Sequence, residues 1–489
     1  MLDYLKSSVV ALALLTGTAA AQDAVTLGMV LEPPNLDPTG GAASAIDEVV
    51  YANLFEGLTR FGPDGSIRPA LAAGWDVQDQ GRVYVFHLHE NVTFHDGSAF
   101  DATDVLFSLD RARAPDSTNA QKVLFENIAA VEAVDPLTVR VTLKQPDGNF
   151  PFKMAWGDAV MVDEASIADI ATHPVGTGPF KFENWVQGDR VVLTAWDGYW
   201  GDKPALKTAT FRFISDPTAA FAAVMAGDVD AFPNFPAPET LFQFETDPRF
   251  RIMIGTSEGE TIMAMNNARP PLDNVKVREA IAHAIKRQDV IDGAMFGYGT
   301  PIGSHFAPHH PDYVDLTAKS DYDPELSKKL LAESGTGPVS LRLALPPPSY
   351  ARRSGEIIAA QLRAVGIETQ ISNVEWAQWL ETVFKGGDFD LTIISHTEPL
   401  DIDIYARPDY YFHYAKPDFQ ALMDRLNGTV DPAGRSDLYR QAQDMIAGDF
   451  VNVFLFQLAR TGVANARLEG LWDNAPTQAN DLTAVRWRQ

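Results

Sequence analysis

The pattern of apolar and polar positions changes its period four times between residues 339 and 395. Alternating stretches predict half-buried strands, and stretches with apolar residues every three or four positions predict helices. The predicted order is strand VSLRLAL (339–345), a helix ending at Gly366, strand IETQIS (367–372), helix 375–385 and strand FDLTIIS (389–395). Strands alternating with helices favour right-handed crossovers and a parallel sheet. The sequence therefore predicts an α/β fold.

Earlier segments add further elements of both kinds. RVYVFHL (82–88) is typical of a strand, and Asp101 is a good N-cap for a helix with apolar residues at 102, 105, 106 and 109. Asp216-Pro217 opens another helix, which Gly227 closes. No repeat or long linker separates these segments, so we expect domain boundaries at chain crossings.

The first residues predict a secretory signal peptide over residues 1–21. Val9 to Leu15 is an apolar run, and Ala19-Ala20-Ala21 fits a cleavage site before Gln22. The run is shorter than the roughly 20 residues that a membrane span needs. We therefore expect the chain to be exported. The chain contains no cysteine, which excludes a lipid anchor on cysteine, thiol catalysis and zinc–thiolate sites.

The length and the net charge of the chain limit the number of domains and the kinds of binding partner. A chain of 489 residues with 46% hydrophobic residues can form two or three domains. The net charge of −26 argues against binding to nucleic acid or anionic lipid, and it favours cationic or zwitterionic solutes near the surface.

The segment SHTEPLDIDIYARPDYYFHY (395–414) concentrates acids and aromatic rings in a predicted loop. The loop, 396–410, leaves the carboxyl end of the third predicted strand. Ligands of open α/β sheets bind outside the carboxyl ends of the strands. The sequence therefore predicts a binding site here.

Seven blocks of the sequence, in order, resemble the family 5 extracytoplasmic solute-binding proteins, which serve ABC importers of peptides, nickel and opines. They are LDP (36–38), VYANLFEGL (50–58), LAAGWDVQDQGRVYVFHLHENVTFHDGSAFDATDVLFSLDRAR (71–113), VGTGPFKFENW (175–185), AAVMAGDVDAF (222–232), NNARPPLDNVKVREAIAHAIKR (266–287) and YDPELSKKLLAESG (322–335).

The resemblance implies a bilobal periplasmic-binding-protein fold of the three-domain, cluster C type. A ligand cleft would lie between the lobes, which close by hinge motion. Domain I would comprise 22–46, 172–258 and 470–489, domain II 47–171, and domain III 259–469. The chain would cross between lobes near 256–262 and 460–470. The implied partners are a small solute and the permease subunits of an importer at the inner membrane.

The resemblance also implies an anchor for the solute. In peptide-binding relatives an aspartate in the corresponding loop pairs the α-amine of the ligand, which makes Asp401 and Asp403 the candidates here. Both could instead cap local turns or face solvent. The Asp-Pro with a nearby Asn that is common in those relatives is replaced here by Leu-Asp-Ile-Asp-Ile-Tyr.

Other side chains complete the predicted ligand-binding set. Arg407 could clamp a carboxylate or form a salt bridge with Asp403 or Asp409. The aromatic candidates could line a pocket or belong to the core. They are Tyr405, Tyr410, Tyr411 and Trp379. Asn35 and Asp37 stand in LEPPNLDP (31–38), a loop that family members place by the cleft.

Metal and enzyme chemistry are not expected. HFAPHHP holds His305, His309 and His310, but no carboxylate stands at helical spacing, and Pro308 and Pro311 predict an irregular surface loop. We therefore predict no metal site and no cofactor. No nucleophile elbow, His-Glu-x-x-His or phosphate loop occurs, and GTGPF (176–180) lacks the phosphate-loop lysine.

The predicted function is therefore a non-enzymatic receptor that captures a small amine-bearing solute, such as a short peptide or amino-acid derivative. An oligosaccharide or opine receptor, in which aromatic stacking replaces the amine–carboxylate pair, is the alternative within the class. A secreted α/β hydrolase is the alternative of another class.

Overall fold

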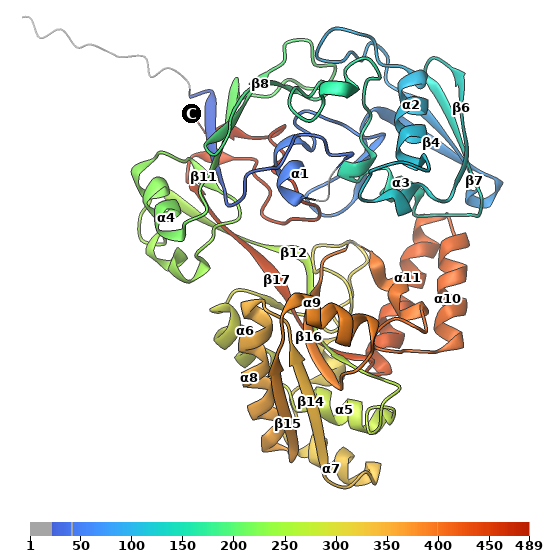
Figure 1. The fold of residues 1–489 in the computed structure, drawn as a ribbon, viewed down its shortest axis with the longest axis vertical. Coiled ribbons are helices and arrows are strands. Elements are labelled where there is room, and N and C mark those ends of the chain that lie inside the picture. Colours follow the sequence, from blue (N-terminus) through green and yellow to red (C-terminus); the bar gives the residue numbers. More distant parts are fainter. Residues whose placement is uncertain (1–21, 41–42, 399, 489) are drawn as a thin grey trace, which may run out of the picture.

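The computed structural model describes residues 22–40, 43–398 and 400–488. The predicted signal peptide, residues 1–21, lies outside the described residues. Within them, no helix is long and apolar enough to cross a membrane. The chain forms two lobes joined by two long strands, β12 (Phe250–Met265) and β17 (Asn452–Asn465) (Figure 1).

The first lobe, drawn at the top of Figure 1, contains two packed units. One is built on β1 (Ala24–Met29), α1 (Ser44–Val50), β8 (Phe180–Val186), β9 (Arg190–Ala195), β10 (Thr208–Phe213), α4 (Pro217–Ala226) and β11 (Ala231–Phe232). The other is an antiparallel sheet of β4 (Ala72–Gln78), β5 (Val83–Leu88), β6 (Ile128–Asp135) and β7 (Thr138–Leu143), covered by α2 (Ala102–Arg113) and α3 (Phe150–Lys153). Two short pairs complete the lobe, β2 (Thr59–Phe61) with β3 (Ile67–Pro69) and β18 (Leu468–Glu469) with β19 (Arg486–Trp487).

The second lobe contains the alternating segment predicted from the sequence. Its elements are α5 (Val275–His283), α6 (Arg287–Met295), β13 (Thr300–Pro301), α7 (Pro324–Ser334), β14 (Val339–Leu345), α8 (Ser349–Ala364), β15 (Ile367–Asn373), α9 (Trp376–Trp379) with a π-helical turn (Leu380–Lys385), β16 (Leu391–His396), α10 (Pro417–Gly428) and α11 (Pro432–Gly448). β14 pairs in parallel with both β15 and β16, so the predicted parallel sheet is confirmed.

The residues predicted to begin and end helices α2 and α4 do so in the structure. The Asp101 carboxylate accepts a hydrogen bond from the Thr103 N–H, and the Asp104 carboxylate accepts one from the Asp101 N–H, which together form a capping box at the start of α2. Asp216 caps α4 by accepting from the Ala219 N–H. Gly227 ends α4 with a φ of 78°, a conformation that favours glycine.

A single sheet runs through both lobes in the order β15-β14-β16-β12-β17-β11-β1-β10-β9-β8, with β13 paired to β17. The first half of β12 pairs with the end of β17 in the first lobe, from Phe250 opposite Asn465. Its second half pairs with the start of β17 and with β16 in the second lobe. The register of β12 and β17 shifts between Thr256 and Glu260. Such an irregularity bends a strand, and it lies at the passage between the lobes.

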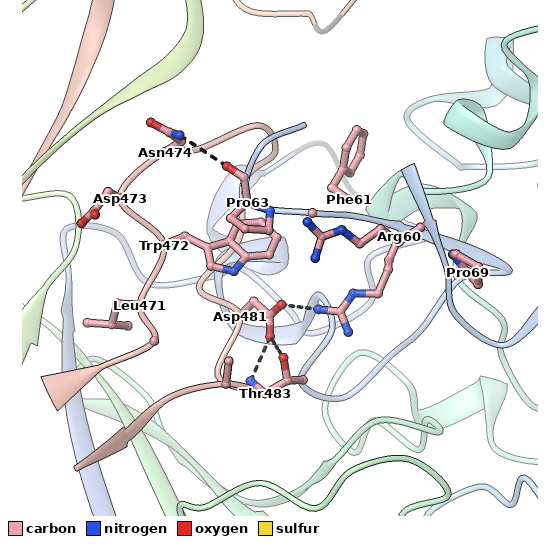
Figure 2. Close-up of a pocket in the computed structure, with 14 residues that line it drawn as sticks. Arg60, Phe61, Pro63, Pro69, Leu471, Trp472, Asp473, Asn474, Asp481 and Thr483 are labelled. Atoms are coloured by element: carbon pink, nitrogen blue, oxygen red, sulfur yellow. Dashed lines mark hydrogen bonds and ion pairs between the residues drawn. The ribbon is translucent and has the colours of Figure 1, made fainter. Parts of the chain in front are cut away.

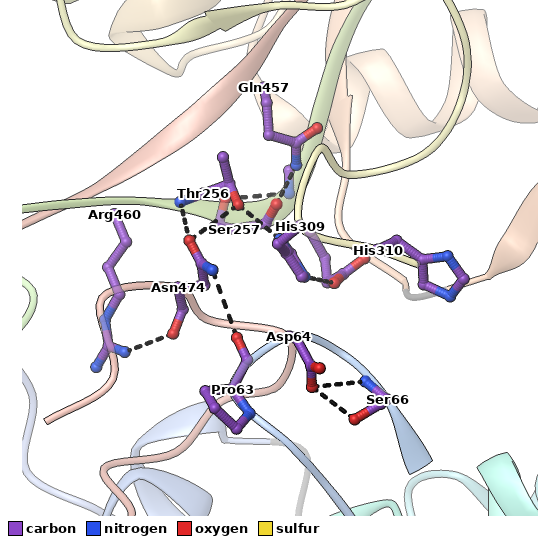
Figure 3. A network of polar contacts seen from close by, with 12 residues as sticks. Pro63, Asp64, Ser66, Thr256, Ser257, His309, His310, Gln457, Arg460 and Asn474 are labelled. Atoms are coloured by element: carbon purple, nitrogen blue, oxygen red, sulfur yellow. Dashed lines mark hydrogen bonds and ion pairs between the residues drawn. The ribbon is translucent and has the colours of Figure 1, made fainter. Parts of the chain in front are cut away.

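Polar contacts tie both lobes to this passage (Figure 3). The Thr256 N–H donates to Asn474 Oδ1 at 3.0 Å, and Asn474 Nδ2 donates to the Pro63 carbonyl at 3.4 Å, both from the first lobe. On the other side, Thr256 Oγ1 lies 2.6 Å from Nδ1 of His309, a residue of the second lobe. Directional polar contacts therefore help to hold the passage between the lobes.

A buried histidine fixes a close approach of two backbones in the first lobe. His95 Nδ1 accepts from the Gly176 N–H at 3.2 Å, and Nε2 donates to the Gly178 carbonyl at 2.9 Å. A Cβ added at Gly176 would lie 2.0 Å from the Leu54 carbonyl oxygen, which explains this glycine of the GTGPF segment. Burial lowers the pKa of His95 to about 4.

We expect His95 to make stability depend on pH. The unfolded chain binds the imidazole proton near pH 6.5 and the folded chain only near pH 4, so stability is complete above pH 6.5 and is lost as pH falls toward 4. The loss from this group between pH 7.5 and 5 is about 2 kcal/mol. Urea unfolding at both pH values measures it. His95→Gln should be less stable at pH 7.5 and show a smaller pH dependence; an equal pH dependence would contradict this role.

Candidate functional site, a cleft between the lobes

A cavity of about 1180 Å³ lies between the lobes. The first lobe contributes a wall from residues 121–156, which includes Phe152 and Trp156. The second lobe contributes a wall from residues 379–439, which includes the segment that follows β16. The carboxyl end of a parallel strand therefore does face a cavity, as the position of the loop in the sequence predicts.

The predicted site residues fall into three groups. Those that line the cavity are Asp401, Asp403, Arg407, Tyr410, Tyr411 and Trp379. Tyr405 lies behind them, fully buried in the core of the second lobe. Asn35 and Asp37 are not among the described residues that line the cavity.

Asp401 is held by histidines. It begins a 3₁₀ turn, η8 (Asp401–Ala406), and its Oδ1 accepts from His305 Nε2 at 2.7 Å. His396 Nδ1 lies 3.6 Å from the other carboxylate oxygen. Burial alone would raise the pKa of Asp401, but the attraction of His305 and His396 and the hydrogen bond from His305 outweigh it and hold the pKa below its ordinary value. Asp401 is therefore an ionised carboxylate at the cavity wall.

Tyr405 fixes the orientation of the histidine that holds Asp401. Its hydroxyl lies 3.2 Å from His305 Nδ1 and accepts from Asn452 Nδ2 at 3.3 Å. Tyr405 thus supports the predicted anchor from the core and is a positioning residue.

Asp403 and Arg407 pair with each other. Arg407 Nη2 donates to Asp403 Oδ2 at 2.7 Å, and both side chains are about half exposed. This is the salt bridge that the sequence left as the alternative to a carboxylate clamp. An exposed pair of this kind contributes about 0–1 kcal/mol, so either partner can separate at little cost.

The aromatic residues of the predicted site pack in the core of the second lobe and also form part of the cavity wall. Trp379 is 4% exposed and its Nε1 donates to Thr392 Oγ1 at 3.0 Å. The Tyr411 hydroxyl lies 3.1 Å from His396 Nε2, while Tyr410 is partly exposed beside it. Leu380 and Phe384, in the π-helical turn after α9, are exposed and extend this wall.

Asn35 and Asp37 make local contacts. Asn35 Oδ1 accepts from the Asp37 N–H at 2.8 Å, and Asp37 accepts from the Thr39 N–H at 2.8 Å. Asp37 also lies 3.5 Å from Arg111 at the end of α2. These contacts attach the loop to α2, and a role in ligand binding stays a prediction.

The histidine segment is buried, so the predicted surface loop is wrong. The side chains of His305 and His309 are 1% and 2% exposed. His305 meets Asp401, and His309 Nε2 lies 2.7 Å from Glu258 Oε1. Proline spacing correctly indicated irregular backbone, but burial depends on residues about 50 and 100 positions away.

Two buried acids near the cavity were not predicted from the sequence. Glu258 and Glu260 stand at the register shift of β12 and are 9% and 3% exposed. The signal was present, because SEGE (257–260) places two acids between the mostly apolar stretches RIMIGT (251–256) and TIMAM (261–265). Burial raises the pKa of both carboxyl groups.

The lobes also touch directly at one side of the cavity. The Gly148 N–H of the first lobe donates to the Asn427 carbonyl of the second at 3.1 Å. Arg435 of α11 is buried and donates to Asn149 Oδ1 across this contact. The same guanidinium donates to the carbonyls of Leu426 and Thr429 and to the Tyr439 hydroxyl, at 3.1, 3.0 and 3.0 Å.

A second cavity, of about 560 Å³, lies within the first lobe (Figure 2). The β2–β3 hairpin and residues 470–484 line it. Its charged groups already have partners, since Arg60 forms an ion pair with Asp481, and Asp481 also accepts from the Thr483 hydroxyl at 2.6 Å. The cavity between the lobes is therefore the better candidate for a ligand.

Comparison with known proteins agrees with the resemblance seen in the sequence. The family described as "Bacterial extracellular solute-binding proteins, family 5 Middle" matches residues 66–417. Glutathione-binding protein GsiB of Pectobacterium atrosepticum is 30% identical over 478 residues, covering 93% of this chain and 92% of that protein. GsiB of Salmonella typhi is 32% identical over 461 residues, covering 89% of each chain.

Solved structures share the fold. HbpA2 from Haemophilus parasuis superposes with a TM-score of 0.88 at 23% identity, covering 95% of this chain and 100% of that one. The periplasmic murein tripeptide-binding protein MppA, in its unliganded open form, gives a TM-score of 0.87 at 19% identity and covers 96% and 98%. The family match, which spans most of the chain, and the cleft between two lobes lead to one conclusion. The chain belongs to the family 5 extracellular solute-binding proteins, the extracytoplasmic receptors of ABC importers.

Proposed function

We propose that this protein captures a small amine-bearing solute, a short peptide or an amino-acid derivative, and delivers it to the permease subunits of an ABC importer. The observation that carries the proposal is the ionised, largely buried Asp401 at the wall of the cavity between the lobes. An ammonium group in the cavity can add a charge-assisted hydrogen bond to this carboxylate.

The surroundings of Asp401 support a peptide-sized ligand. The apolar wall of Leu380 and Phe384 faces a cavity whose opposite wall includes Val123, Phe152 and Trp156. Apolar side chains of a peptide can pack between such walls while its amine meets the carboxylate. GsiB, as named, binds glutathione, and the Helicobacter pylori protein DppA was solved in complex with the peptide STSA.

The signal peptide, the monomeric state and the three domains expected from the sequence belong to the same proposal. A signal peptide over residues 1–21 would direct the chain to the periplasm, where it would act as a monomer. Domain I (22–46, 172–258 and 470–489) and domain II (47–171) would form one lobe, and domain III (259–469) the other. The contacts around Thr256 would form the hinge.

Ligand binding should draw the lobes together. Small-angle X-ray scattering of the protein, without and with a saturating dipeptide, should show a smaller radius of gyration in the bound state, because closure removes the solvent-filled cavity. A dipeptide whose amine is acetylated serves as the control and should leave the curve unchanged. Unchanged dimensions with a dipeptide that calorimetry shows to be bound would contradict hinge closure.

Turnover assays separate the receptor from the hydrolase alternative. A receptor predicts that a bound peptide or ester is recovered intact, whereas a hydrolase releases products. An oligosaccharide or opine receptor predicts binding that does not depend on a free amine. The acetylated control of the scattering experiment therefore tests that alternative too.

A further inference from the structure

The cavity between the lobes carries an excess of negative charge. Its lining includes six carboxylates and three cationic side chains, namely Glu126, Asp147, Glu398, Asp401, Asp403 and Asp424 against Lys144, Lys153 and Arg407. Asp147 pairs with Lys153 at 2.6 Å and Asp403 pairs with Arg407 at 2.7 Å. Lys144 donates to the main-chain carbonyl of Glu126. Apart from these two ion pairs, four carboxylates remain against the one ammonium group of Lys144, so the net charge of the described lining is negative.

A row of three polar residues crosses the sheet beside Asp401. Glu260 on β12 is directly opposite His396 on β16 and Gln457 on β17. Residues directly opposite in antiparallel strands point to the same face of the sheet, so all three side chains share one face. His396 also lines the cavity and lies 3.6 Å from Asp401. The row therefore extends from the cavity wall into the sheet.

Two oxygens in this row lack a hydrogen-bond partner among the described residues. They are Glu260 Oε2 and Gln457 Oε1, and both side chains are at least 97% buried, with 3% and 0% exposure. A buried acceptor without a donor costs about 1–3 kcal/mol. Glu258 and Asp401, the neighbouring acids, each have a histidine partner, whereas Glu260 has none in the described part of the chain.

We propose that Glu260 is a second acidic determinant of the cleft, and that the solute carries a second cationic group beside its amine, as in a dipeptide whose first residue is basic. Glu260 is not among the described residues that line the cavity; it lies next to the lining residue His396 in the sheet and acts through its charge from behind the cavity wall. The proposal rests on the proposed function, because Asp401 takes the amine. The groups that face Glu260 are Glu258 on its own strand, Glu398 and Asp401 after β16, His396 on β16 and Gln457 on β17.

The protonation state of Glu260 gives a second observable. Burial, with repulsion from Glu258 and Asp401, raises its pKa well above the ordinary value, which favours the neutral form of the carboxyl group in the empty protein. A cation that approaches it favours the ionised form. Binding of a basic solute should therefore release a proton, and binding of a neutral one should not.

Isothermal titration calorimetry tests this with matched ligands. Lys-Ala and norleucine-Ala have side chains of similar shape that differ in charge, as do Arg-Ala and citrulline-Ala. The wild type should prefer the basic member of each pair by about tenfold or more. Glu260→Gln should remove this preference and leave the affinity for norleucine-Ala within about threefold of wild type. The same titrations in phosphate and in Tris, two buffers with different ionisation enthalpies, should give different binding enthalpies only for the wild type with basic ligands. That difference measures the proton released on binding.

Glu258→Gln is the matched control, because this acid is buried on the same strand but already meets His309. It should keep the preference for basic ligands. If the wild type binds both members of each pair with equal affinity, or if the preference survives in Glu260→Gln, the inference about Glu260 is wrong, while the proposed amine-bearing solute still stands. Binding of none of the four dipeptides counts against the proposed amine-bearing solute, and the inference fails with it. Circular dichroism confirms that each variant folds.

Discussion

Asp401→Asn should weaken an amine-bearing solute on the order of 100- to 3000-fold. Removing the charge leaves the ammonium group without an anionic partner in a closed cleft, and breaking a buried pair costs roughly 3–5 kcal/mol, at 1.4 kcal/mol for each tenfold change. Calorimetry with the best dipeptide ligand measures the loss. The asparagine oxygen can still accept from His305 Nε2, so the melting temperature should fall only a few degrees.

Asp403→Asn is the control for Asp401. The two aspartates stand two positions apart and line the same cavity, but Asp403 is about half exposed and pairs with Arg407. Its replacement should change affinity by about tenfold or less, because exposed pairs contribute about 0–1 kcal/mol. If Asp403→Asn weakens binding more than Asp401→Asn, the anchor has been assigned to the wrong aspartate. If neither variant binds more weakly than wild type, the anchor lies elsewhere.

Arg435→Ala should lower the free energy of unfolding by about 3 kcal/mol, because a buried guanidinium is removed and several acceptors lose their donor. These acceptors are the carbonyls of Leu426 and Thr429, the Tyr439 hydroxyl and Asn149 Oδ1 of the other lobe. Urea unfolding followed by tryptophan fluorescence measures the change.

Arg440→Ala on the same helix supplies the comparison. Arg440 is 55% exposed and meets only Asp437, itself 70% exposed, among the described residues. Its loss should change stability by less than about 0.5 kcal/mol. Similar effects for both arginines would show that the contact between Arg435 and the first lobe adds nothing beyond an ordinary surface charge.

Local patterns were sufficient to predict the alternating strands and helices of the second lobe. The alternation from 339 to 395 correctly predicted three parallel strands, and the rule for carboxyl ends correctly placed the loop after β16 against a cavity. Capping signals at Asp101 and Asp216 also hold, because a cap depends on residues within one helical turn. These features are encoded in segments short enough to be seen in a single sequence.

The partners of the loop could not be predicted in this way. Asp401 is held by His305, nearly a hundred positions earlier, and it lies beside Glu260 of β12. Neither residue is near the loop in sequence, and only the pairing of β12 with β16 brings the acid there. The histidine segment was misjudged for the same reason, since proline spacing describes backbone regularity and says nothing of what covers it.

The sharing of β12 and β17 between the lobes also constrains the order of folding. Neither lobe can complete its sheet before residues 452–465 are available, and the Trp487 indole donates to the Ala24 carbonyl at 2.8 Å, which joins the first strand to the last residues described. Contacts of such long sequence separation form slowly. A chain synthesised from its N-terminus therefore stays incompletely folded until its last residues have emerged, because both lobes wait for the same strand.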